Sequence, residues 1–263
     1  MGTQFMNDTL VMKFGGASVA TIDHFSIIAD IILTRSVEHP SIVVVISAMG
    51  ETTNQLIGLA NYINEKPPQR EYDMLISVGE RISMALLAMA LLKKNKEAIS
   101  FTGSQAGIIT CNNHANARII DVKPDRLLSS LKEGKIVIVA GFQGVSKEKE
   151  VTTLGREGSD TTAVAIGIAL NASKVEFFKD VPGIFDKDPK GDSSAFQYSR
   201  LTYEQALAIV ERGAQILHRR AIQLAAKNGL PLHVKSFLSK DKHNYGTIIS
   251  DLLNVRRRDI QYE

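Results

Sequence analysis

Apolar residues occur along this chain in short continuous runs that alternate with stretches of helical spacing. The continuous runs are rich in Val, Ile, Leu and Phe, which is typical of strands covered on both faces of a sheet; they are LVMKF, SIVVVIS, KIVIV, KVEFF and LPLHV. The helical spacing predicts helices at about residues 22–34, 71–94, 160–170 and 203–227. This alternation predicts an α/β protein whose sheet has helices on each side.

The composition sets limits on the class of protein. Hydrophobic residues make up 44% and charged residues 22%, which is ordinary for a globular protein, and the net charge of +3 gives no indication of nucleic acid binding. Cys111 is the single cysteine, so an internal disulfide is impossible and a zinc site is disfavoured. The longest uncharged apolar run, ISMALLAMALL, is too short to span a bilayer. We therefore expect a cytoplasmic protein with neither a membrane nor a nucleic acid partner.

Glycine-bearing loops stand at several of the predicted strand ends. KFGGAS, SAMGETTN and AGFQG follow strands, and TLGREGSDTTA leads into a helix. Glycine lets a ligand approach the backbone, and N–H groups at strand ends and helix N-termini favour phosphate. Neither the P-loop pattern nor a strand–GxGxxG–helix fingerprint occurs, which disfavours a P-loop NTPase and a Rossmann dehydrogenase.

Two charged constellations accompany these loops. A lysine within a strand is often a snorkelling or edge residue, but Lys13 is followed at once by a glycine pair, which favours contact with a transferring phosphoryl group. In the GREGSD segment, Arg156 is suited to bidentate binding of a carboxylate. Ser159 and Asp160 are expected to cap the following helix, and Asp160 is also suited to hold Lys13 by its charge.

The ordered motifs of the chain resemble those of the aspartokinases of the amino acid kinase family. They extend from residue 10 to about residue 250 and are KFGGASV, VISAMGETTN, SVGERIS, GSQAGIIT, AGFQGV, TLGREGSDTTA, KDVPGIFDKDP and GAQILHRRA. The resemblance implies a three-layer α/β/α sandwich with a mostly parallel central sheet. It implies two lobes, with residues 1–170 binding the amino acid and residues 171–263 binding the nucleotide.

The resemblance also implies a reaction and a set of site residues. The reaction is transfer of the ATP γ-phosphoryl group to the β-carboxylate of L-aspartate, which forms 4-phospho-L-aspartate on the way to lysine, threonine and methionine. Lys13 would stabilise the transferring group and Asp160 would orient Lys13, while Mg²⁺ would bridge the phosphates with few protein ligands and no dedicated metal site. The other implied residues are Gly15, Gly16 and Ser18 for phosphate; Thr53, Glu80, Arg156 and Ser159 for aspartate, with Arg156 on its α-carboxylate and Glu80 near its ammonium; and Lys179, Asp180, Phe185, Lys190 and Gln215 for the nucleotide.

Several positions depart from the family pattern, including GREGSD where GRGGSD is commoner and KDV where TDV is. Ala17 stands where Ser or Thr is usual, Phe185 where Tyr is frequent, Gln215 where Lys is usual and Arg219 where Pro is familiar. We expect these changes to affect nucleotide affinity and turnover more than the type of reaction. Two alternatives stay open: another kinase of the family acting on acetylglutamate, glutamate, carbamate or UMP, and a ligand-binding homologue that has lost catalysis.

Regulation and assembly are the least defined by the sequence. Typical aspartokinases continue into a pair of ACT domains, whereas this sequence stops soon after residue 250, so we expect no ACT regulatory domain in it. An unregulated enzyme, a separate regulatory chain and a shortened chain are all compatible with this, and no feedback inhibitor is indicated. A homodimer is expected from the family.

Overall fold

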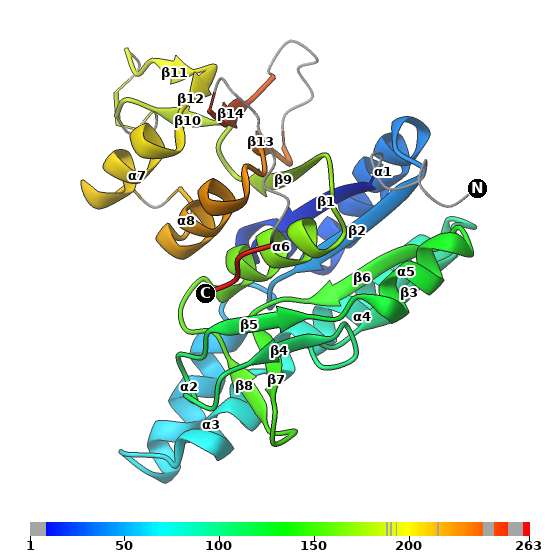
Figure 1. Ribbon diagram of the computed structural model, residues 1–263, viewed down its shortest axis with the longest axis vertical. Helices are drawn as coiled ribbons and strands as arrows, with labels where there is room; N and C mark the ends of the chain where they lie inside the picture. The colour runs from blue at the N-terminus through cyan, green and yellow to red at the C-terminus, as the bar shows by residue number, and fades with distance from the viewer. Residues whose placement is uncertain are drawn as a thin grey trace.

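A central sheet of eight strands organises the molecule (Figure 1). The structure is a computed structural model, and it describes residues 9–187, 189, 191–192, 194–214, 216–238, 245–251 and 260–263. From one edge to the other the strands are β12 (Arg200–Leu201), β14 (Thr247–Ile249), β13 (Leu232–Ser236), β9 (Lys174–Lys179), β1 (Thr9–Phe14), β2 (Ser41–Ile46), β6 (Ile136–Ala140) and β3 (Ala98–Phe101). Among these neighbours the β13–β14 pair is antiparallel and the others are parallel.

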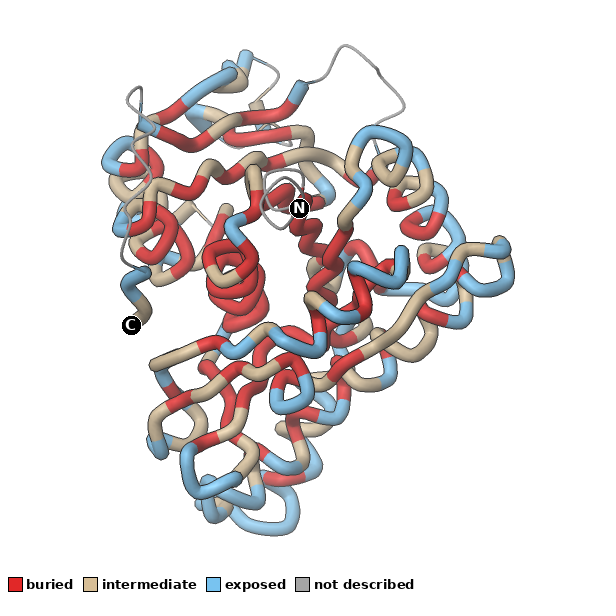
Figure 2. The backbone as a smooth tube through the Cα atoms, turned by 45° about the vertical axis from the view of Figure 1, so that its right-hand side comes forward, coloured by how far each residue is buried: buried red, intermediate tan, exposed pale blue. Residues whose placement is uncertain are grey.

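Helices cover both faces of this sheet. One face carries α1 (Ile22–Glu38) and α4 (Val78–Lys93); the other carries α5 (Asp125–Lys132), α6 (Gly158–Ala169) and α8 (Arg219–Asn228), with α7 (Tyr203–Glu211) packed against α8. Figure 2 shows the buried residues concentrated in the central strands and in the helices against them. The predicted α/β/α sandwich with a mostly parallel sheet is therefore confirmed.

Alternation along β1 determines which helix layer Lys13 meets. Leu10, Met12 and Phe14 pack in the core beneath α1 and α4, and Val11 packs in the opposite core with α6 and α8. Successive side chains of a strand point to opposite faces, so Lys13 shares the face of Val11. The lysine therefore points toward α6, near the carboxyl end of the strand.

A smaller sheet lies beyond the end of β6, on the side of the molecule that also carries two helices (Figure 1). Its order is β5 (Ile119–Val122), β4 (Ile108–Thr110), β7 (Gln143–Ser146) and β8 (Val151–Thr153), and the two helices are α2 (Thr52–Ile63) and α3 (Gln69–Ile76). The short 3₁₀ helix η2 (Gly16–Val19) follows β1, and β10 (Ile184–Phe185) pairs with β11 (Gln197–Tyr198). The continuous apolar runs did not predict these short strands.

The prediction of a single helix at residues 203–227 is wrong. The chain forms α7 and α8 instead, and between them Gly213 has φ +99°. A glycine in the left-handed region just after a helix ends it. The apolar spacing continues across this break because both helices face the same core.

The predicted helical run at residues 71–94 is likewise two helices, α3 and α4, which meet at Ser77. The Ser77 carbonyl accepts a hydrogen bond from the Gln143 side chain at 2.8 Å, and a side chain inserted at a carbonyl is a known cause of helix bending. Among the described helices, the combined run Gln69–Lys93 is long and apolar enough, by length and composition alone, to cross a membrane. It carries the buried carboxylates Asp73 and Glu80 and forms part of the core.

The predicted lobe boundary at residues 170–171 falls between α6 and β9. Because β9 pairs directly with β1, the central sheet runs through both segments without interruption. The division into an amino acid lobe and a nucleotide lobe stays a prediction.

Candidate active site

A buried ion pair stands where β1 ends. Lys13 Nζ lies 2.6 Å from Asp160 Oδ1, and the two side chains are 6% and 1% exposed. The other carboxylate oxygen of Asp160 accepts the backbone N–H of His218 at 3.1 Å. Asp160 thus joins β1 to the first turn of α6 and to the residue before α8, and it fixes the position of the lysine ammonium.

The pKa values of this pair reflect burial and a second lysine. Burial lowers the pKa of Lys13 below its ordinary value, against the opposing charge of Asp160. Burial alone would raise the pKa of Asp160, but the charges of Lys13 and Lys179, with hydrogen bonds from Lys13 and His218, lower it. Lys179, at the end of β9, acts on both partners, so two lysine charges stand near one another here, and Glu157 also acts on Lys13. Two neighbouring cations suit a phosphate.

The glycine pair after β1 leaves room beside the ammonium. A Cβ at Gly15 would lie 3.4 Å from Lys13 Nζ, and one at Gly16 would lie 3.4 Å from the Ala48 carbonyl oxygen. The Ser18 hydroxyl, in contrast, is buried and donates to the Phe178 carbonyl at 3.0 Å, which links η2 to β9. A phosphate contact of Ser18 stays a prediction.

A cavity of about 370 Å³ opens next to this pair. The four residues predicted to hold aspartate all line it, although they come from distant parts of the chain; they are Thr53, Glu80, Arg156 and Ser159. Gly16 lines it as well, so the cavity reaches the glycine pair and the neighbourhood of Lys13. We refer to it, after the ligand predicted for it, as the amino acid cavity.

Glu80 presents a buried carboxylate to the amino acid cavity. The residue is 3% exposed, Oε1 accepts the Ala48 backbone N–H at 3.2 Å, and Oε2 has no hydrogen-bond partner among the described residues. Close packing makes this possible, because a Cβ at Gly79 would lie 2.6 Å from Ala48 Cβ. Burial raises the pKa of Glu80 to about 7, against the effect of backbone hydrogen bonds and Lys13. An unpaired buried carboxylate oxygen suits a ligand ammonium.

The segment before α6 turns Arg156 into the same cavity. Gly155 and Glu157 have φ values of +79° and +56°, and Arg156 between them is exposed. Arg156 makes no hydrogen bond or ion pair with another residue that the structure describes, so its guanidinium is open to a carboxylate.

The prediction that Ser159 and Asp160 cap α6 is wrong. The N-cap residue is Glu157, with no side-chain cap hydrogen bond, and both predicted residues lie within the first turn. The left-handed turn starts the helix at Gly158, and Asp160 bonds Lys13 instead of the helix backbone. The uncapped start of α6 borders the amino acid cavity, where its N–H groups favour an anion.

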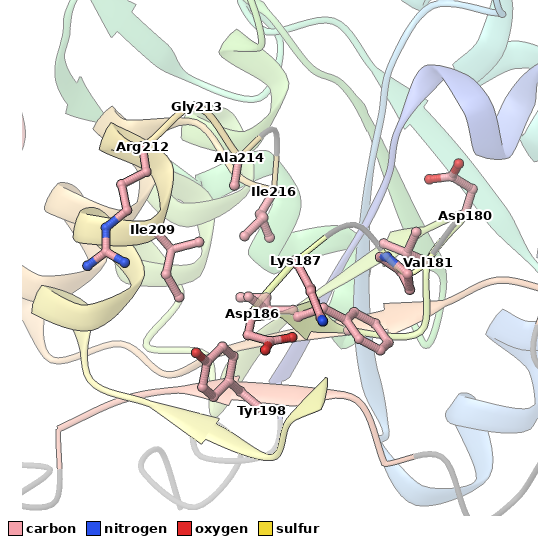
Figure 3. Close-up of a pocket in the computed structure, with 14 residues that line it drawn as sticks. Asp180, Val181, Asp186, Lys187, Tyr198, Ile209, Arg212, Gly213, Ala214 and Ile216 are labelled. Atoms are coloured by element: carbon pink, nitrogen blue, oxygen red, sulfur yellow. The ribbon is translucent and has the colours of Figure 1, made fainter. Parts of the chain in front are cut away.

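A second cavity, of about 580 Å³, lies beyond the end of β9 (Figure 3). The predicted residues Asp180 and Phe185 line it, and Lys179 directly precedes them. Lys190 and Gln215, also predicted for the nucleotide, lie outside the described residues. Apolar side chains that the sequence did not indicate, Ile184, Ile209 and Ile216, contribute to its walls. We refer to it, after the ligand predicted for it, as the nucleotide cavity.

The donor set near the ion pair was compared with the needs of Mg²⁺. Within the part of the chain that the structure describes, no three His, Cys, Asp or Glu side chains converge as a metal site. Asp160 is bound by Lys13, and Asp180 lines the nucleotide cavity. Mg²⁺ with a nucleotide keeps several waters and is held by phosphates and one or two carboxylates. This sparse donor set fits a magnesium ion that arrives with the nucleotide.

Several cavity residues were not predicted from the sequence. Tyr72 and Ile76 line the amino acid cavity with Glu80, and the spacing of four residues between them was an available signal. Ala115 also lines it, from a loop between two short strands that had not been predicted. No local pattern marks that position.

Comparison with known proteins gives a consistent set of relatives. Residues 8–236 match the model of the Amino acid kinase family. The aspartokinase of Mycobacterium bovis (strain ATCC BAA-935 / AF2122/97) is 48% identical over 231 residues, which are 88% of this chain and 55% of that protein. The aspartate kinase from Synechocystis has a TM-score of 0.80 and 41% identity, covering 92% of this chain and 39% of that one.

A structure with bound ligands is among the similar folds. E. coli aspartokinase III in complex with aspartate and ADP has a TM-score of 0.82 and 28% identity, covering 92% of this chain and 64% of that one. The chain spans about 55% to 60% of the length of the curated relatives that it matches first.

Proposed function

The chain belongs to the amino acid kinase family, and from that membership we propose that it is an aspartate kinase, which transfers the γ-phosphoryl group of ATP to the β-carboxylate of L-aspartate. The observation that carries the proposal is the Lys13–Asp160 pair. Ser159, next to Asp160 in the chain, lines the amino acid cavity, and Lys179, whose charge acts on the pair, directly precedes Asp180 in the nucleotide cavity. Aspartokinases at 44% to 48% identity support the choice of acceptor within the family. The cytoplasm is the proposed location.

In this proposal the amino acid cavity holds aspartate by its charges. Arg156 pairs with the α-carboxylate, and the free oxygen of Glu80 accepts a hydrogen bond from the ammonium. Thr53 and Ser159 add hydroxyls that donate or accept. The β-carboxylate is then directed toward the glycine pair after β1.

The transfer needs positioning more than proton movement. A β-carboxylate oxygen attacks the γ-phosphorus, the bond from that phosphorus to the β–γ bridging oxygen breaks, and ADP leaves with the electron pair. Because the acceptor is already a carboxylate, no base has to remove a proton. Lys13 stabilises the charge that spreads over the equatorial oxygens, and Asp160 prevents it from swinging away. Mg²⁺, when bound with the nucleotide, would neutralise the β- and γ-phosphates.

A substrate panel tests the proposed function. The purified chain is incubated with ATP and Mg²⁺ and, in turn, aspartate, glutamate, acetylglutamate, carbamate and UMP, while ADP release is followed and acyl phosphate is trapped with hydroxylamine. We expect ADP and hydroxamate with aspartate. Turnover with a different acceptor alone would assign the chain to another branch, and calorimetric binding of ATP and aspartate without product would make it a binding homologue.

We also propose a homodimer, for which α4 offers a surface. Val78, Ile82, Ala85, Met89 and Leu92 follow one another at intervals of four and three residues, which is the spacing of a helix-pairing seam. Four of them are 37% to 62% exposed, and the seam contains no charge. Because the seam is apolar throughout, it can pack against the same seam of a second copy related by a two-fold axis. A second copy of this chain is therefore the proposed occupant.

A further inference from the structure

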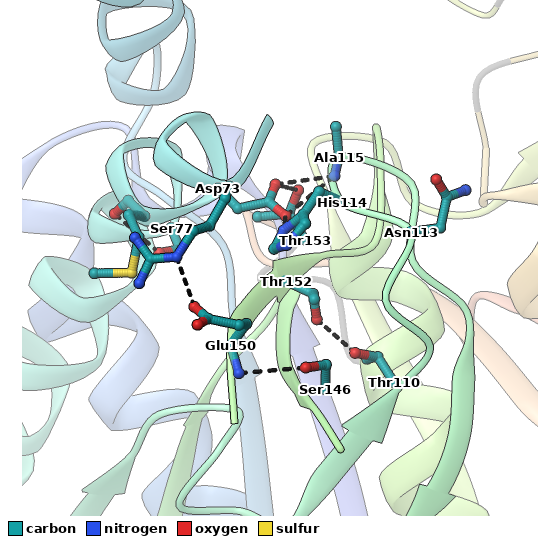
Figure 4. A network of polar contacts seen from close by, with 12 residues as sticks. Asp73, Ser77, Thr110, Asn113, His114, Ala115, Ser146, Glu150, Thr152 and Thr153 are labelled. Carbon is teal, nitrogen blue, oxygen red and sulfur yellow. Dashed lines mark hydrogen bonds and ion pairs between the residues drawn. The ribbon is translucent and has the colours of Figure 1, made fainter. Parts of the chain in front are cut away.

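A fully buried carboxylate lies next to the amino acid cavity without lining it. Asp73, on α3, is 0% exposed, and three groups from other segments donate to it (Figure 4). Thr153 Oγ1 lies 2.6 Å from Oδ1, His114 Nδ1 lies 2.7 Å from Oδ2, and the Ala115 backbone N–H is shared by both oxygens at 3.1 Å. The carboxylate thus collects donors from the 112–117 loop and from the end of β8.

These donors are direct neighbours of cavity residues. Ala115 itself lines the amino acid cavity and has φ +62°, a left-handed conformation that a non-glycine residue adopts only when its surroundings hold it. Thr153 ends β8, and the chain continues from it through Leu154 and Gly155 to Arg156. Asp73 therefore fixes one cavity wall and the strand end that carries the guanidinium.

The same two segments also contact each other and are bonded by a residue of α8. A Cβ at Gly155 would lie 3.1 Å from Asn116 Oδ1 and 3.5 Å from the Ala115 carbonyl oxygen. Arg220, on α8, donates to Asn116 Oδ1 at 3.0 Å and to the Leu154 carbonyl at 3.1 Å. The loop and the strand end, with its direct neighbour Leu154, are thus each bonded to both Arg220 and Asp73.

A second contact from α3 to the small sheet provides a comparison. Arg70, three residues before Asp73, pairs with Glu150 at 2.8 Å, but these side chains are 48% and 39% exposed. Glu150 lies just before β8, at the end remote from Thr153. An exposed ion pair of this kind contributes little, and neither partner lines the amino acid cavity.

We infer that Asp73 is a positioning residue that sets the affinity for the amino acid substrate without touching it. Its charge holds Ala115 in the left-handed region and holds the end of β8, so that Arg156 meets the α-carboxylate of the substrate. The identity of that substrate as aspartate rests on the proposed function. The nucleotide cavity contains none of the groups that Asp73 binds, so nucleotide affinity is independent of it.

The variant Asp73→Asn tests this inference. Asn replaces one carboxylate oxygen by an NH₂ group that faces two donors, so the 112–117 loop loses its anchor at nearly unchanged volume. We expect the KM for aspartate to rise at least about tenfold and the KM for ATP to stay within about twofold. The reason is that binding of the amino acid, but not of the nucleotide, depends on the cavity wall that Asp73 holds. Arg70→Ala is the matched control on α3 and leaves both constants unchanged. Arg156→Ala is the reference for loss of the direct contact.

A purely structural role predicts a different result. Loss of stability alone lowers the folded fraction, so that kcat per mole of chain falls while both KM values stay the same. Amide hydrogen exchange of residues 112–117 gives a readout independent of turnover: we expect faster exchange in Asp73→Asn and no change in Arg70→Ala. Equal KM values for aspartate in wild type and Asp73→Asn would overturn the inference, as would unchanged exchange.

Two further outcomes are covered. If Asp73→Asn does not fold, Thr153→Val and His114→Phe each remove one donor, and we expect each to raise the KM for aspartate about two- to fivefold; no rise in either would overturn the inference. If the wild-type chain does not phosphorylate aspartate, the proposed function fails. The inference about Asp73 is then still tested by amide hydrogen exchange, which needs no substrate, and by the KM for the acceptor that the chain does use.

Discussion

Lys13 owes its chemistry to its place in β1 and to one partner. The alternation of the strand turns it toward α6, where Asp160 binds it at 2.6 Å. A lysine at an edge strand of the same composition would point its ammonium into water. Here the charge is buried beside Gly15, where we propose that it contacts a phosphate.

Removal of the Lys13 charge is expected to affect the transition state more than the bound nucleotide. We expect Lys13→Ala to lower kcat by about 10²- to 10³-fold. The Kd for ATP should change by less than about tenfold, since ground-state binding uses the whole nucleotide cavity. Steady-state kinetics and calorimetry measure the two effects, and Lys13→Arg shows whether charge alone is sufficient. A large loss of ATP affinity at near-normal kcat would contradict the assigned role.

Glu80 is expected to make aspartate affinity depend on pH. Its pKa is raised to about 7, and only the ionised form attracts the substrate ammonium. The KM for aspartate should therefore be lowest above pH 7 and rise by up to about tenfold per unit as the pH falls below 7. Aspartate itself does not titrate between about pH 5 and 8. Glu80→Gln should have a high KM that does not vary over this range; a KM that follows the wild-type profile would contradict this.

Ionisation of Glu80, which favours aspartate binding, is expected to lower the stability of the fold. A carboxyl whose folded pKa lies above its unfolded value of 4.5 binds more protons in the folded state between those two values. Unfolding free energy therefore decreases as the pH rises from 4.5 to about 7, by up to about 3 kcal/mol. Urea denaturation of Glu80→Gln should show no such decrease and a higher stability than wild type at pH 8. A less stable variant at pH 8 would contradict it.

At the scale of elements, burial on both faces explains which parts the sequence could predict. β1, β2, β6 and β9 are buried throughout or nearly so, and their continuous apolar runs were recognised. The small sheet consists of strands of three or four residues with mixed polarity, so no period was long enough to identify them. The break between α7 and α8 depends on one glycine conformation and was missed.

The residues of the site were also predictable from the sequence only in part. Residues within ordered motifs, such as Glu80 and Arg156, were identified by resemblance and meet in one cavity. Asp73 and Ala115 belong to the site through a contact 42 positions apart in the chain, which no local pattern contains. Long-range hydrogen bonds of this kind require the fold.

Alanine substitutions at two glycines, one in a crowded and one in an open position, test the packing of α6 against the end of β6. A Cβ at Gly141 would lie 2.7 Å from Cβ and Oγ of Ser159, whereas a Cβ at Gly58 in α2 meets nothing within 4 Å. We expect Gly141→Ala to destabilise by about 1–3 kcal/mol and to lower activity by displacing the first turn of α6. Gly58→Ala should stabilise by about 0.5–1 kcal/mol through helix propensity. Urea denaturation measures both, and the same sign for the two would contradict the packing.

At the scale of the whole molecule, the α4 seam predicts the assembly. We expect a mass of twice 28.8 kDa by light scattering for the wild type and 28.8 kDa for Ile82→Glu or Met89→Glu, because a buried charge opposes pairing of the seam. Leu59→Glu, on α2, replaces a residue that is 60% exposed outside the seam and should stay dimeric. A monomeric wild type, or a dimer unaffected by both seam variants, would contradict the proposed interface.

The uninterrupted sheet places the two cavities and Lys13 at the ends of neighbouring strands. β9, β1 and β2 are consecutive, and their ends contribute to the nucleotide cavity, the lysine and the amino acid cavity respectively. In the proposed reaction, donor, lysine and acceptor would follow the order of these neighbouring strands, which are about 4.8 Å apart. The transferred phosphorus would then move across the strands, along the direction of their hydrogen bonds, so the backbone ladder would fix the direction of the transfer.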